Sequence, residues 1–272
     1  MADEAMPDWA PPGVDAKRAN VARVYDYWLG GTHNFLADQD LGRAISAVEP
    51  NMRAIARANR AFLRRAVRYL GEVGIGQFLD IGSGIPTEGN VHEIAQRANP
   101  GARVAYVDVD PVAIAHSKVI LEGNDNASII DADLREPEKI RSHETVGRLI
   151  DFSQPAALIL MVVLHFIADA EQPAQIMTTL REALAPGSYL VLGHATHDGK
   201  PVVAHASEKV YNRNVATQLH LRSHDEILRF FDGFELLDPG LVYAPMWRPE
   251  SPDDVPSDPG AFGTLVGVAR KP

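Results

Sequence analysis

The first part of the chain contains two stretches with the apolar spacing of a helix. Between residues 17 and 29 the apolar side chains recur every three or four positions, at Val21, Val24, Tyr25, Trp28 and Leu29. The following Gly30 and Gly31 predict the end of this helix. Residues 51–73 repeat the spacing with arginines in between, which predicts a second helix with a basic outer face and an apolar inner face. Residues 17–75 are therefore expected to form a helical extension or lid ahead of the main fold.

From residue 76 onward, short β-rich apolar runs replace the long helical pattern. Five of them alternate with helical segments, namely QFLDIG, ARVAYVDVD, ASIIDAD, AALILMVV and SYLVLGHAT. This alternation predicts a mainly parallel sheet with helices on both faces. Two last runs, GFELLDPG and TLVGVAR, have no clear helix between them and predict a closing antiparallel hairpin. The expected fold class is α/β, with a seven-stranded, mostly parallel sheet in a single domain whose core is residues 76–272.

Composition and charge limit the classes of partner. The 272 residues are 46% hydrophobic and 23% charged, which is typical of a globular chain. Residues 1–16 combine prolines with acidic residues and are expected to form a flexible tail without contacts to the fold. The longest apolar run, residues 156–164, is too short for a membrane span, and the acidic start lacks the features of a signal peptide. We therefore expect a soluble, cytoplasmic protein without a membrane partner.

Net charge and the absence of cysteine exclude further classes. The net charge of −10 disfavours a nucleic-acid partner, because the phosphate backbone would be repelled. With no cysteine, the chain has no disulfide, zinc–thiolate site, iron–sulfur cluster or thiol nucleophile. His194 and His197 have a spacing too short and too unsupported to indicate a metal, so no metal site is predicted.

Acidic residues follow three consecutive predicted strands. The first strand runs into Asp80, Gly82, Ser83 and Gly84, a strand-to-helix turn where glycines let the backbone approach a nucleotide-type ligand. Asp108 ends the second strand, where a carboxylate accepts hydrogen bonds from a ribose diol. After the third strand, Asp133 is placed to accept a hydrogen bond from an adenine amino group. Although a lone G-x-G is often only a turn, the three features together favour a nucleotide site.

The residues around the glycine turn discriminate between nucleotide ligands. A dinucleotide site for NAD carries a third glycine, where this chain has Thr87, and no carboxylate beside the diphosphate. Asp80 would repel a diphosphate but would pair with the ammonium and sulfonium groups of S-adenosylmethionine. The sequence therefore favours S-adenosylmethionine as the cofactor over NAD.

These motifs carry a resemblance to a known family. DIGSG, YVDVDP and DADLREP resemble those of class I, Rossmann-like S-adenosylmethionine-dependent methyltransferases. The resemblance extends over most of the chain and is closest to an actinobacterial group of these enzymes. It rests there on ARVYDYWLGGTHNFLADQD, on ANRAFLRRAVRYL and on the stretch from GIGQFLDIGSG to NVHEIAQ. The resemblance implies that Asp80, Gly82 and Gly84 face the methionine part, Asp108 the ribose, and Asp133 with Leu134 the adenine. The expected cofactor-binding set is completed by Ser83, Val109, Met161, Tyr25, Gly31 and Asn34. The sequence departs from the family at Ile85-Pro86-Thr87, where many members have another glycine.

The segment from Tyr25 to Phe35 combines aromatic residues, a Gly-Gly pair and Asn34. Such a segment is expected to close over a small-molecule site as a lid, although the same residues also suit a helix end packed in the core. His165, after the fourth strand, is a candidate catalytic residue that would orient or deprotonate a hydroxyl or amine, and His194 after the fifth strand is a second. Each has packing as its alternative role. Residues 200–222 are expected to cover the acceptor, and their Arg, Asn and His residues favour a polar or anionic small molecule over a lipid.

The sequence thus predicts an S-adenosylmethionine-dependent methyltransferase acting on a small-molecule acceptor. The alternatives are a non-catalytic S-adenosylmethionine-binding protein and, in third place, an NAD-dependent or nucleotide-sugar oxidoreductase. The sequence leaves open the acceptor, the attacking atom and the oligomeric state.

Overall fold

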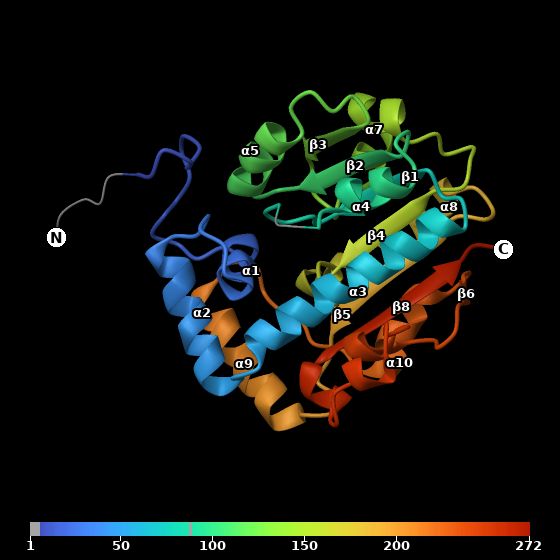
Figure 1. Cartoon of the computed structure of the whole chain (residues 1–272). Helices are drawn as coiled ribbons and strands as arrows, with labels where there is room; N and C mark the ends of the chain where they lie inside the picture. The colour runs from blue at the N-terminus through green and yellow to red at the C-terminus, as the bar shows by residue number, and fades with distance from the viewer. Residues whose placement is uncertain (1–5, 87–88) are drawn as a thin grey trace.

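The centre of the computed structural model, which describes residues 6–86 and 89–272, is a mixed sheet (Figure 1). The strands within these residues are β1 (Gln77–Ile81), β2 (Arg103–Asp108), β3 (Ala127–Asp131), β4 (Ala157–Met161), β5 (Tyr189–Ala195), β6 (Glu235–Leu236), β7 (Val242–Tyr243) and β8 (Thr264–Arg270). Their order is β3-β2-β1-β4-β5-β8-β6, and β7 also pairs with β8. The first five strands are parallel, and β8 runs antiparallel to β5.

The sheet confirms the predicted fold class. All five parallel strands lie where the sequence predicts them, and β8 pairs antiparallel with β6 as expected for the closing hairpin. The difference is β7, a two-residue strand that also pairs with β8 and adds an eighth strand to the predicted seven. Two residues are too few to give a periodic pattern, so the sequence carried no signal for this strand.

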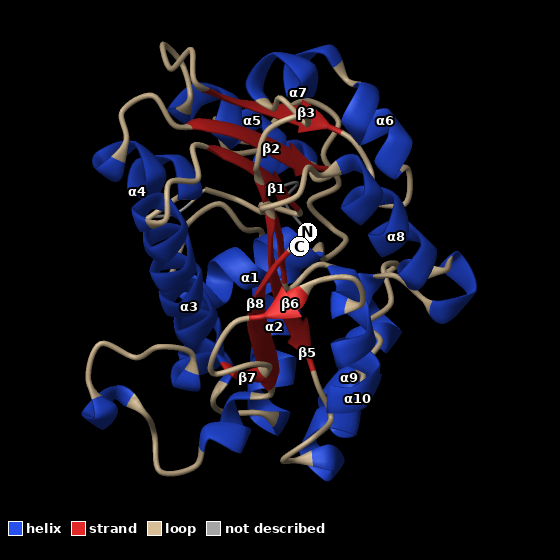
Figure 2. Cartoon of the chain, turned by 90° about the vertical axis from the view of Figure 1, so that its right-hand side faces the viewer, coloured by secondary structure: helices blue, strands red, loops and turns tan. Residues whose placement is uncertain are grey.

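Helices cover both faces of the sheet (Figure 2). They are α1 (Val21–Leu29), α2 (Leu36–Val48), α3 (Met52–Glu72), α4 (Val91–Ala98), α5 (Pro111–Ile120), α6 (Pro137–Ser142), α7 (Glu144–Leu149), α8 (Pro173–Ala183), α9 (Pro201–Asn214) and α10 (His224–Leu228). Alternate residues of β4 enter two different cores, as side chains on opposite faces of a strand must. Leu158 and Leu160 pack with the cluster that includes α7 and α8, whereas Ile159 packs with the cluster that includes α3 and α4. Among the described residues, no helix is long and apolar enough to cross a membrane.

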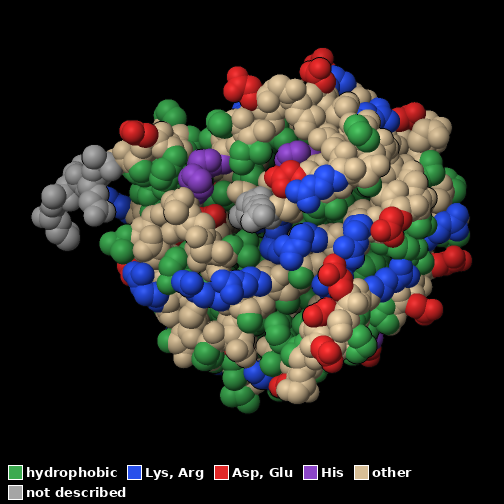
Figure 3. All heavy atoms as spheres, in the orientation of Figure 1, with side chains coloured by type: hydrophobic (Ala, Val, Ile, Leu, Met, Phe, Trp, Pro, Cys, Tyr) green, Lys and Arg blue, Asp and Glu red, His purple; other side chains and the backbone are tan. Residues whose placement is uncertain are grey.

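The long helix α3 has the two faces that the sequence predicts. Phe62 and Leu70 are fully buried against the sheet, while Figure 3 shows Lys and Arg side chains gathered over the face on which α3 lies. Part of this basic face is used within the molecule. The Arg65 guanidinium donates through Nε to the Trp247 carbonyl at 2.9 Å, and Arg68 pairs with Glu250 at 2.9 Å. The helix therefore also anchors the loop that precedes β8.

The helical extension contains one helix more than the sequence predicts. The predicted first helix is α1, with Asn20 as its N-cap, but residues 36–48 form α2 where the pattern indicated a loop. In α2, Leu41, Ile45 and Val48 have the spacing of a helix, a signal that the prediction of a loop overlooked. Gly42 lies among them and lowers the helix propensity of the stretch. The structure explains this glycine, because a Cβ there would collide with the Tyr27 ring of α1.

The N-terminal segment differs from the expected tail. Residues 1–5 lie outside the described part of the chain, but Trp9 and Val14 pack against a cluster of Phe35, Ile85 and Val112. The Trp9 ring lies 4.8 Å from the Phe35 ring, between centroids. Residues 6–16 therefore contact the fold, contrary to the prediction from their composition. A single tryptophan buries enough apolar area to hold a short segment that has no periodic pattern.

Candidate active site

A cavity of about 320 Å³ lies at the carboxyl ends of β1, β2 and β4, covered by residues of α1, α2, α3 and α9. The volume lies in the range of small-molecule sites, and carboxyl ends of strands in such sheets are where ligands bind. The structure brings eleven of the fourteen residues predicted for the site into its lining: Tyr25, Asp80, Gly82, Ser83, Gly84, Asp108, Val109, Asp133, Leu134, Met161 and His165. Gly31, Asn34 and His194 are not part of this lining.

The turn after β1 is held open by two glycines and a carboxylate. Gly82 and Gly84 have φ angles of 74° and 68°, a region that favours glycine, and a Cβ on Gly82 would collide with Val163. Asp108 at the end of β2 accepts a hydrogen bond from the Gly84 N–H at 2.7 Å through Oδ2. Its Oδ1 accepts from the N–H groups of Val109 and Asp110. Asp108 therefore fixes the turn, and one lone pair of Oδ2 remains for a ligand. Thr87, at the position of the expected third glycine, lies outside the described residues.

Asp80 is a buried carboxylate facing the cavity without a hydrogen-bond partner among the described residues; only 5% of the residue is exposed. Burial raises the pKa of Asp80 to about 7, while Arg60 lowers it and Asp108 raises it. Arg60 is itself engaged, because its Nη2 donates to the Gly89 carbonyl at 3.1 Å. A carboxylate in this state is stabilised by a cationic ligand, which adds positive charge to that of Arg60.

The far end of the cavity, beyond β3, has one charged wall and one apolar wall. Asp133 accepts from the Arg135 N–H at 2.8 Å and pairs with the Arg135 guanidinium at 3.3 Å. Arg135 is held in turn by Glu171. The Leu134 side chain is buried beside this network. Asp133 Oδ2 retains accepting capacity, because its only contact here is the Arg135 Nη1 at 3.3 Å.

His165 lines the cavity and is neutral. Its Nδ1 accepts a hydrogen bond from the Ala195 N–H at 3.2 Å, which places the ring proton on Nε2. Burial, assisted by His194 and Arg222, lowers the pKa of His165 well below its usual value. Nε2 has no hydrogen-bond partner within the described residues, so it can donate to a molecule in the cavity. This geometry suits a group that orients an acceptor rather than one that deprotonates it.

His194 has a structural environment, contrary to the sequence-based expectation that it faces the acceptor. It is fully buried, its Nδ1 donates to the Ala195 carbonyl at 2.7 Å, and its Nε2 accepts from Arg222 Nη1 at 2.9 Å. Arg222 also forms an ion pair with Asp169 at 2.7 Å. Burial lowers the pKa of His194 to about 3, so the ring stays neutral. His194 lies within β5, not after it as predicted, so the prediction identified the right edge of the sheet but not the direction of the side chain.

Gly31 and Asn34 also have structural roles, in the loop between α1 and α2. The Asp26 carboxylate accepts from the His33 N–H at 3.0 Å and from Asn34 Nδ2 at 2.8 Å. A Cβ on Gly31 would collide with this carboxylate, which explains the glycine. Of this network, Asp26 alone lines the cavity. The polar residues of this segment therefore hold the shape of the loop, and its cavity surface comes from Tyr25, Asp26, Trp28 and Leu29.

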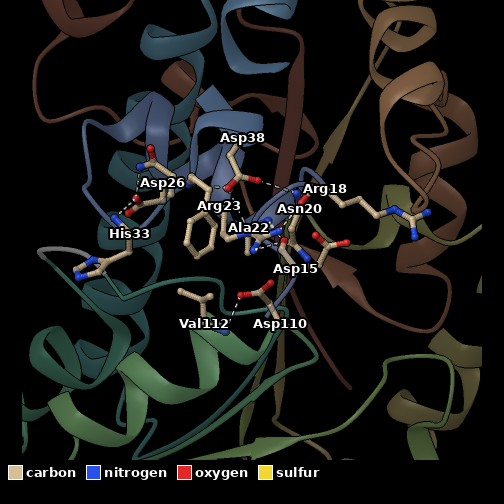
Figure 4. A network of polar contacts seen from close by, with 12 residues as sticks. Asp15, Arg18, Asn20, Ala22, Arg23, Asp26, His33, Asp38, Asp110 and Val112 are labelled. Carbon is tan, nitrogen blue, oxygen red and sulfur yellow. Dashed lines mark hydrogen bonds and ion pairs between the residues drawn. The ribbon is translucent and has the colours of Figure 1, made fainter. Parts of the chain in front are cut away.

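A buried ion pair joins the start of α1 to the start of α2 (Figure 4). Arg23 Nε lies 3.3 Å from Asp38 Oδ2, and both side chains are almost completely buried. Asp38 Oδ1 also accepts from the Asn20 N–H at 2.8 Å, so one carboxylate caps both helices. Arg23 Nη2 donates to the Arg18 carbonyl at 2.7 Å. This network fixes the angle between the two helices that cover the cavity.

Val162, which directly follows β4 and lines the cavity, has a strained backbone. Its φ angle is 53°, in the left-handed region that a β-branched residue rarely adopts. Its N–H donates to the Gly193 carbonyl at 2.8 Å, which holds the residue in this conformation. The neighbouring Val163 contacts the glycine turn. Strain of this kind costs about 1–3 kcal/mol and is typically found at functional sites.

The sequence analysis did not single out Asn59 of α3 or Glu49 at the end of α2, which also line the cavity. Asn59 is 2% exposed on the helix face that carries Ile55, Phe62 and Leu63. A polar residue that interrupts an apolar helix face is a signal that could have identified it. Glu49 gave no such signal, because it lies at the end of a helix that was not predicted.

Comparisons with known proteins agree with this geometry. The family model described as S-adenosyl methyltransferase matches residues 7–272. A crystal structure from Thermobifida fusca YX, named as a candidate methyltransferase, is similar with 41% identity and a TM-score of 0.92 over 97% of this chain and 99% of that one. A DUF574 family protein from Streptomyces avermitilis MA-4680 is 35% identical, with a TM-score of 0.91 over 95% of this chain and 99% of that one.

More distant structures share the fold. The N-methyltransferase NodS from Bradyrhizobium japonicum WM9, in complex with S-adenosyl-L-homocysteine, is 15% identical, with a TM-score of 0.50 over 86% of this chain and 97% of that one. A search of the curated proteins found no match to the chain. The sheet is thus that of class I methyltransferases, preceded by N-terminal helices, and the family match spans nearly all of the sequence. The chain belongs to the S-adenosyl methyltransferase family.

Proposed function

We propose that this protein transfers a methyl group from S-adenosylmethionine to a small-molecule acceptor bound in the same cavity. The observation that supports this function most is Asp80, a buried carboxylate beside the glycine turn with no partner among the described residues. The ammonium and sulfonium of S-adenosylmethionine supply the positive charge that this carboxylate needs, whereas the diphosphate of NAD would be repelled. The residues present therefore fit the cofactor.

The other cavity residues suit the remaining parts of the cofactor. Asp108 has a free lone pair on Oδ2 for a ribose hydroxyl, and Gly82 and Gly84 let the backbone approach the methionine part. Asp133 accepts from the adenine amino group, while the buried Leu134 side chain packs against the ring. Ser83, Val109 and Met161 complete the walls on this side. Tyr25 contributes from α1, where its hydroxyl donates to the Ala56 carbonyl at 3.2 Å.

The proposed mechanism depends on positioning. When bound, S-adenosylmethionine would supply a methyl group activated by its sulfonium, and a nucleophile of the acceptor would take up this methyl group in line, with S-adenosylhomocysteine as the leaving group. The protein's contribution is to align the acceptor and to exclude water, which can provide most of the rate enhancement. His165 holds its proton on Nε2 and donates it to the acceptor as a hydrogen bond, while the helical cover formed by α1, α2 and α9 limits access of water.

Calorimetry and a methyl-transfer assay test this function. The protein should bind S-adenosylmethionine and S-adenosylhomocysteine, with no measurable binding of NAD, and Asp80→Asn should weaken binding of the first two. Asp125→Asn, which changes an exposed carboxylate, is the matched control. Preferential binding of NAD would overturn the proposal. Methyl release over a panel of small-molecule acceptors separates an enzyme from a protein that only binds the cofactor.

A further inference from the structure

Unpaired buried polar atoms are concentrated around the cavity. Within the described residues, seven buried side-chain nitrogen or oxygen atoms have no hydrogen-bond partner. Four of them belong to residues that line the cavity: Asn59 Oδ1, Ser83 Oγ, Ser207 Oγ and Tyr211 Oη. Such atoms destabilise a free protein unless a ligand or water pairs with them. Their accumulation at one cavity indicates a ligand that does so.

Three of these residues form a group apart from the glycine turn. Asn59 comes from α3, and Ser207 and Tyr211 come from α9, whereas Ser83 lies in the turn assigned to the cofactor. Tyr211 and Ala56, which is one turn before Asn59 on α3, pack in the same cluster. We call Asn59, Ser207 and Tyr211 the α3–α9 wall. Ser207 and Tyr211 belong to the helical cover, and Phe166 links Tyr211 to His165, which the proposed mechanism turns toward the acceptor.

The surroundings of the α3–α9 wall are apolar and aromatic. Met52, Ile55 and Leu219 line the cavity near it, and the Phe166 ring stacks on the Tyr211 ring at 5.9 Å between centroids and 23° between planes. A polar molecule without an apolar part would leave this surface in contact with water. The occupant must therefore combine apolar area with a few hydrogen-bonding groups.

The charges around the cavity restrict the occupant further. The lining contains seven acidic residues and three basic ones among the described residues. Two of the basic residues are already engaged within the protein, Arg60 with the Gly89 carbonyl and Arg135 with Asp133 and Glu171. Lys200, at the start of α9, is the third basic residue, and the lining as a whole keeps an excess of four acidic residues, so a carboxylate or phosphate on the acceptor would meet net repulsion. This charge balance reverses the sequence-based preference for an anionic molecule.

We infer that the α3–α9 wall binds the methyl acceptor, a neutral or cationic, partly apolar molecule that carries a hydroxyl or amine group. Asn59 Oδ1 accepts a hydrogen bond from that group, and the hydroxyls of Ser207 and Tyr211 donate to it or accept from it. The identification of this molecule as the methyl acceptor rests on the proposed function. Binding at the wall is testable without the cofactor.

The first test is the stability of the free protein. Tyr211→Phe and Ser207→Ala remove unpaired hydroxyls, so each should raise the midpoint of thermal unfolding. Tyr69→Phe is the control, since Tyr69 packs against Trp247 and does not line the cavity; its midpoint should not rise. A fall in the midpoint for both cavity variants would mean that their hydroxyls are already paired, which overturns the inference.

The second test measures binding of small probes by ligand-observed NMR, with and without S-adenosylhomocysteine. Catechol and benzylamine should bind, and benzoate should bind about tenfold more weakly or not at all. Tyr211→Phe should weaken catechol binding about fivefold to tenfold while leaving the affinity for S-adenosylhomocysteine unchanged. Tight binding of benzoate, no binding of catechol and benzylamine, or equal binding by wild type and variants would each overturn the inference. If the probes bind at the wall but S-adenosylhomocysteine does not bind, the proposed function fails and the binding site stands.

Discussion

Asp80 is the residue whose charge state depends most on what occupies the cavity. Its pKa of about 7 in the free protein means that neutralisation by a proton competes with neutralisation by a cation. A positively charged ligand should therefore release a proton on binding, and its affinity should rise with pH up to about pH 7 and then level off. Calorimetry in buffers of different ionisation enthalpy detects this proton directly. Affinity for S-adenosylmethionine that is constant from about pH 5.5 to about pH 8 would show that Asp80 does not face the cation.

The same residue predicts an unusual effect on stability. In the unfolded chain the carboxyl titrates near 3.8, whereas in the folded protein it titrates near 7, so the folded state binds more protons between these values. Stability should therefore fall as pH rises through this window, and the penalty is complete above it. Asp80→Asn removes the penalty and should stabilise the free protein by about 2–4 kcal/mol at pH 8 but very little at pH 4. Urea unfolding at both pH values measures the difference, with Asp125→Asn as the control.

Asp108 has two roles that a pair of substitutions can separate. Since its carboxylate accepts from three backbone N–H groups, Asp108→Ala should lower stability as well as weaken S-adenosylhomocysteine binding by about 1.5–3 kcal/mol. Asp108→Asn keeps one oxygen acceptor and should retain more of the stability than of the binding. Calorimetry and thermal unfolding give the two quantities, and Asp131→Ala at the exposed end of β3 is the control. Unchanged affinity in a folded Asp108→Ala protein would remove Asp108 from the site.

How much of the site was predictable depends on whether a side chain's direction follows from local structure. At the end of a parallel strand it does, and Asp80, Asp108 and Asp133 all reach the cavity as predicted. In a loop it does not: Asn34 turns toward Asp26 because the tertiary contact between α1 and α2 places a carboxylate there. His194 lies inside β5, where strand alternation turns it to the same face as Leu190 and Leu192, and Arg222, 28 residues away, holds it there.

At the scale of elements, the helical cover is where ligand binding should be visible as a change in dynamics. α1 and α2 contribute residues to the cavity and are joined by the buried pair of Arg23 and Asp38. S-adenosylhomocysteine should therefore slow amide exchange from Tyr25 to Asp38, because a ligand stabilises the closed state that it contacts. Amides of α8, which lines none of the cavity, serve as the internal control. Equal protection with and without ligand would make these helices a fixed part of the core.

The elements themselves were predicted where each has a pattern of its own. β1 to β5 are short, largely apolar runs, and α3 has a regular amphipathic spacing, so both were found. α2 was missed although Leu41, Ile45 and Val48 have helical spacing, because Gly42, which the contact with Tyr27 requires, lowers the helix propensity of the stretch. β7 takes its structure from β8, on which it pairs, and a two-residue strand has no period of its own.

At the scale of the whole molecule, the N-terminal segment ties the helical cover to the sheet. Trp9 contacts Phe35 at the start of α2 and lies 6.0 Å from His116 of α5, between ring centroids. Trp9→Ala should lower stability by about 2–4 kcal/mol, as expected for removal of a packed tryptophan that is not fully buried. It should also weaken S-adenosylhomocysteine binding, because the cover is then less firmly held over the cavity.

Thermal unfolding and calorimetry of Trp9→Ala measure both effects, and Met6→Ala, an exposed residue of the same segment, is the control. If Trp9→Ala behaves as Met6→Ala does, the segment is the mobile tail that its composition indicates. The comparison matters because composition describes a segment in isolation, whereas Trp9 acts through residues more than a hundred positions away.

The left-handed backbone at Val162 has a consequence for directed evolution. A library selected only for heat resistance should accept Val162→Gly, because relief of about 1–3 kcal/mol of backbone strain offsets the packing lost with this partly buried side chain. The same change would remove a side chain from the cavity wall and loosen the junction after β4. Selection for stability alone would thus not protect the site. Laboratory lineages of this protein need an activity screen at each round, and Val162 is the position to sequence first.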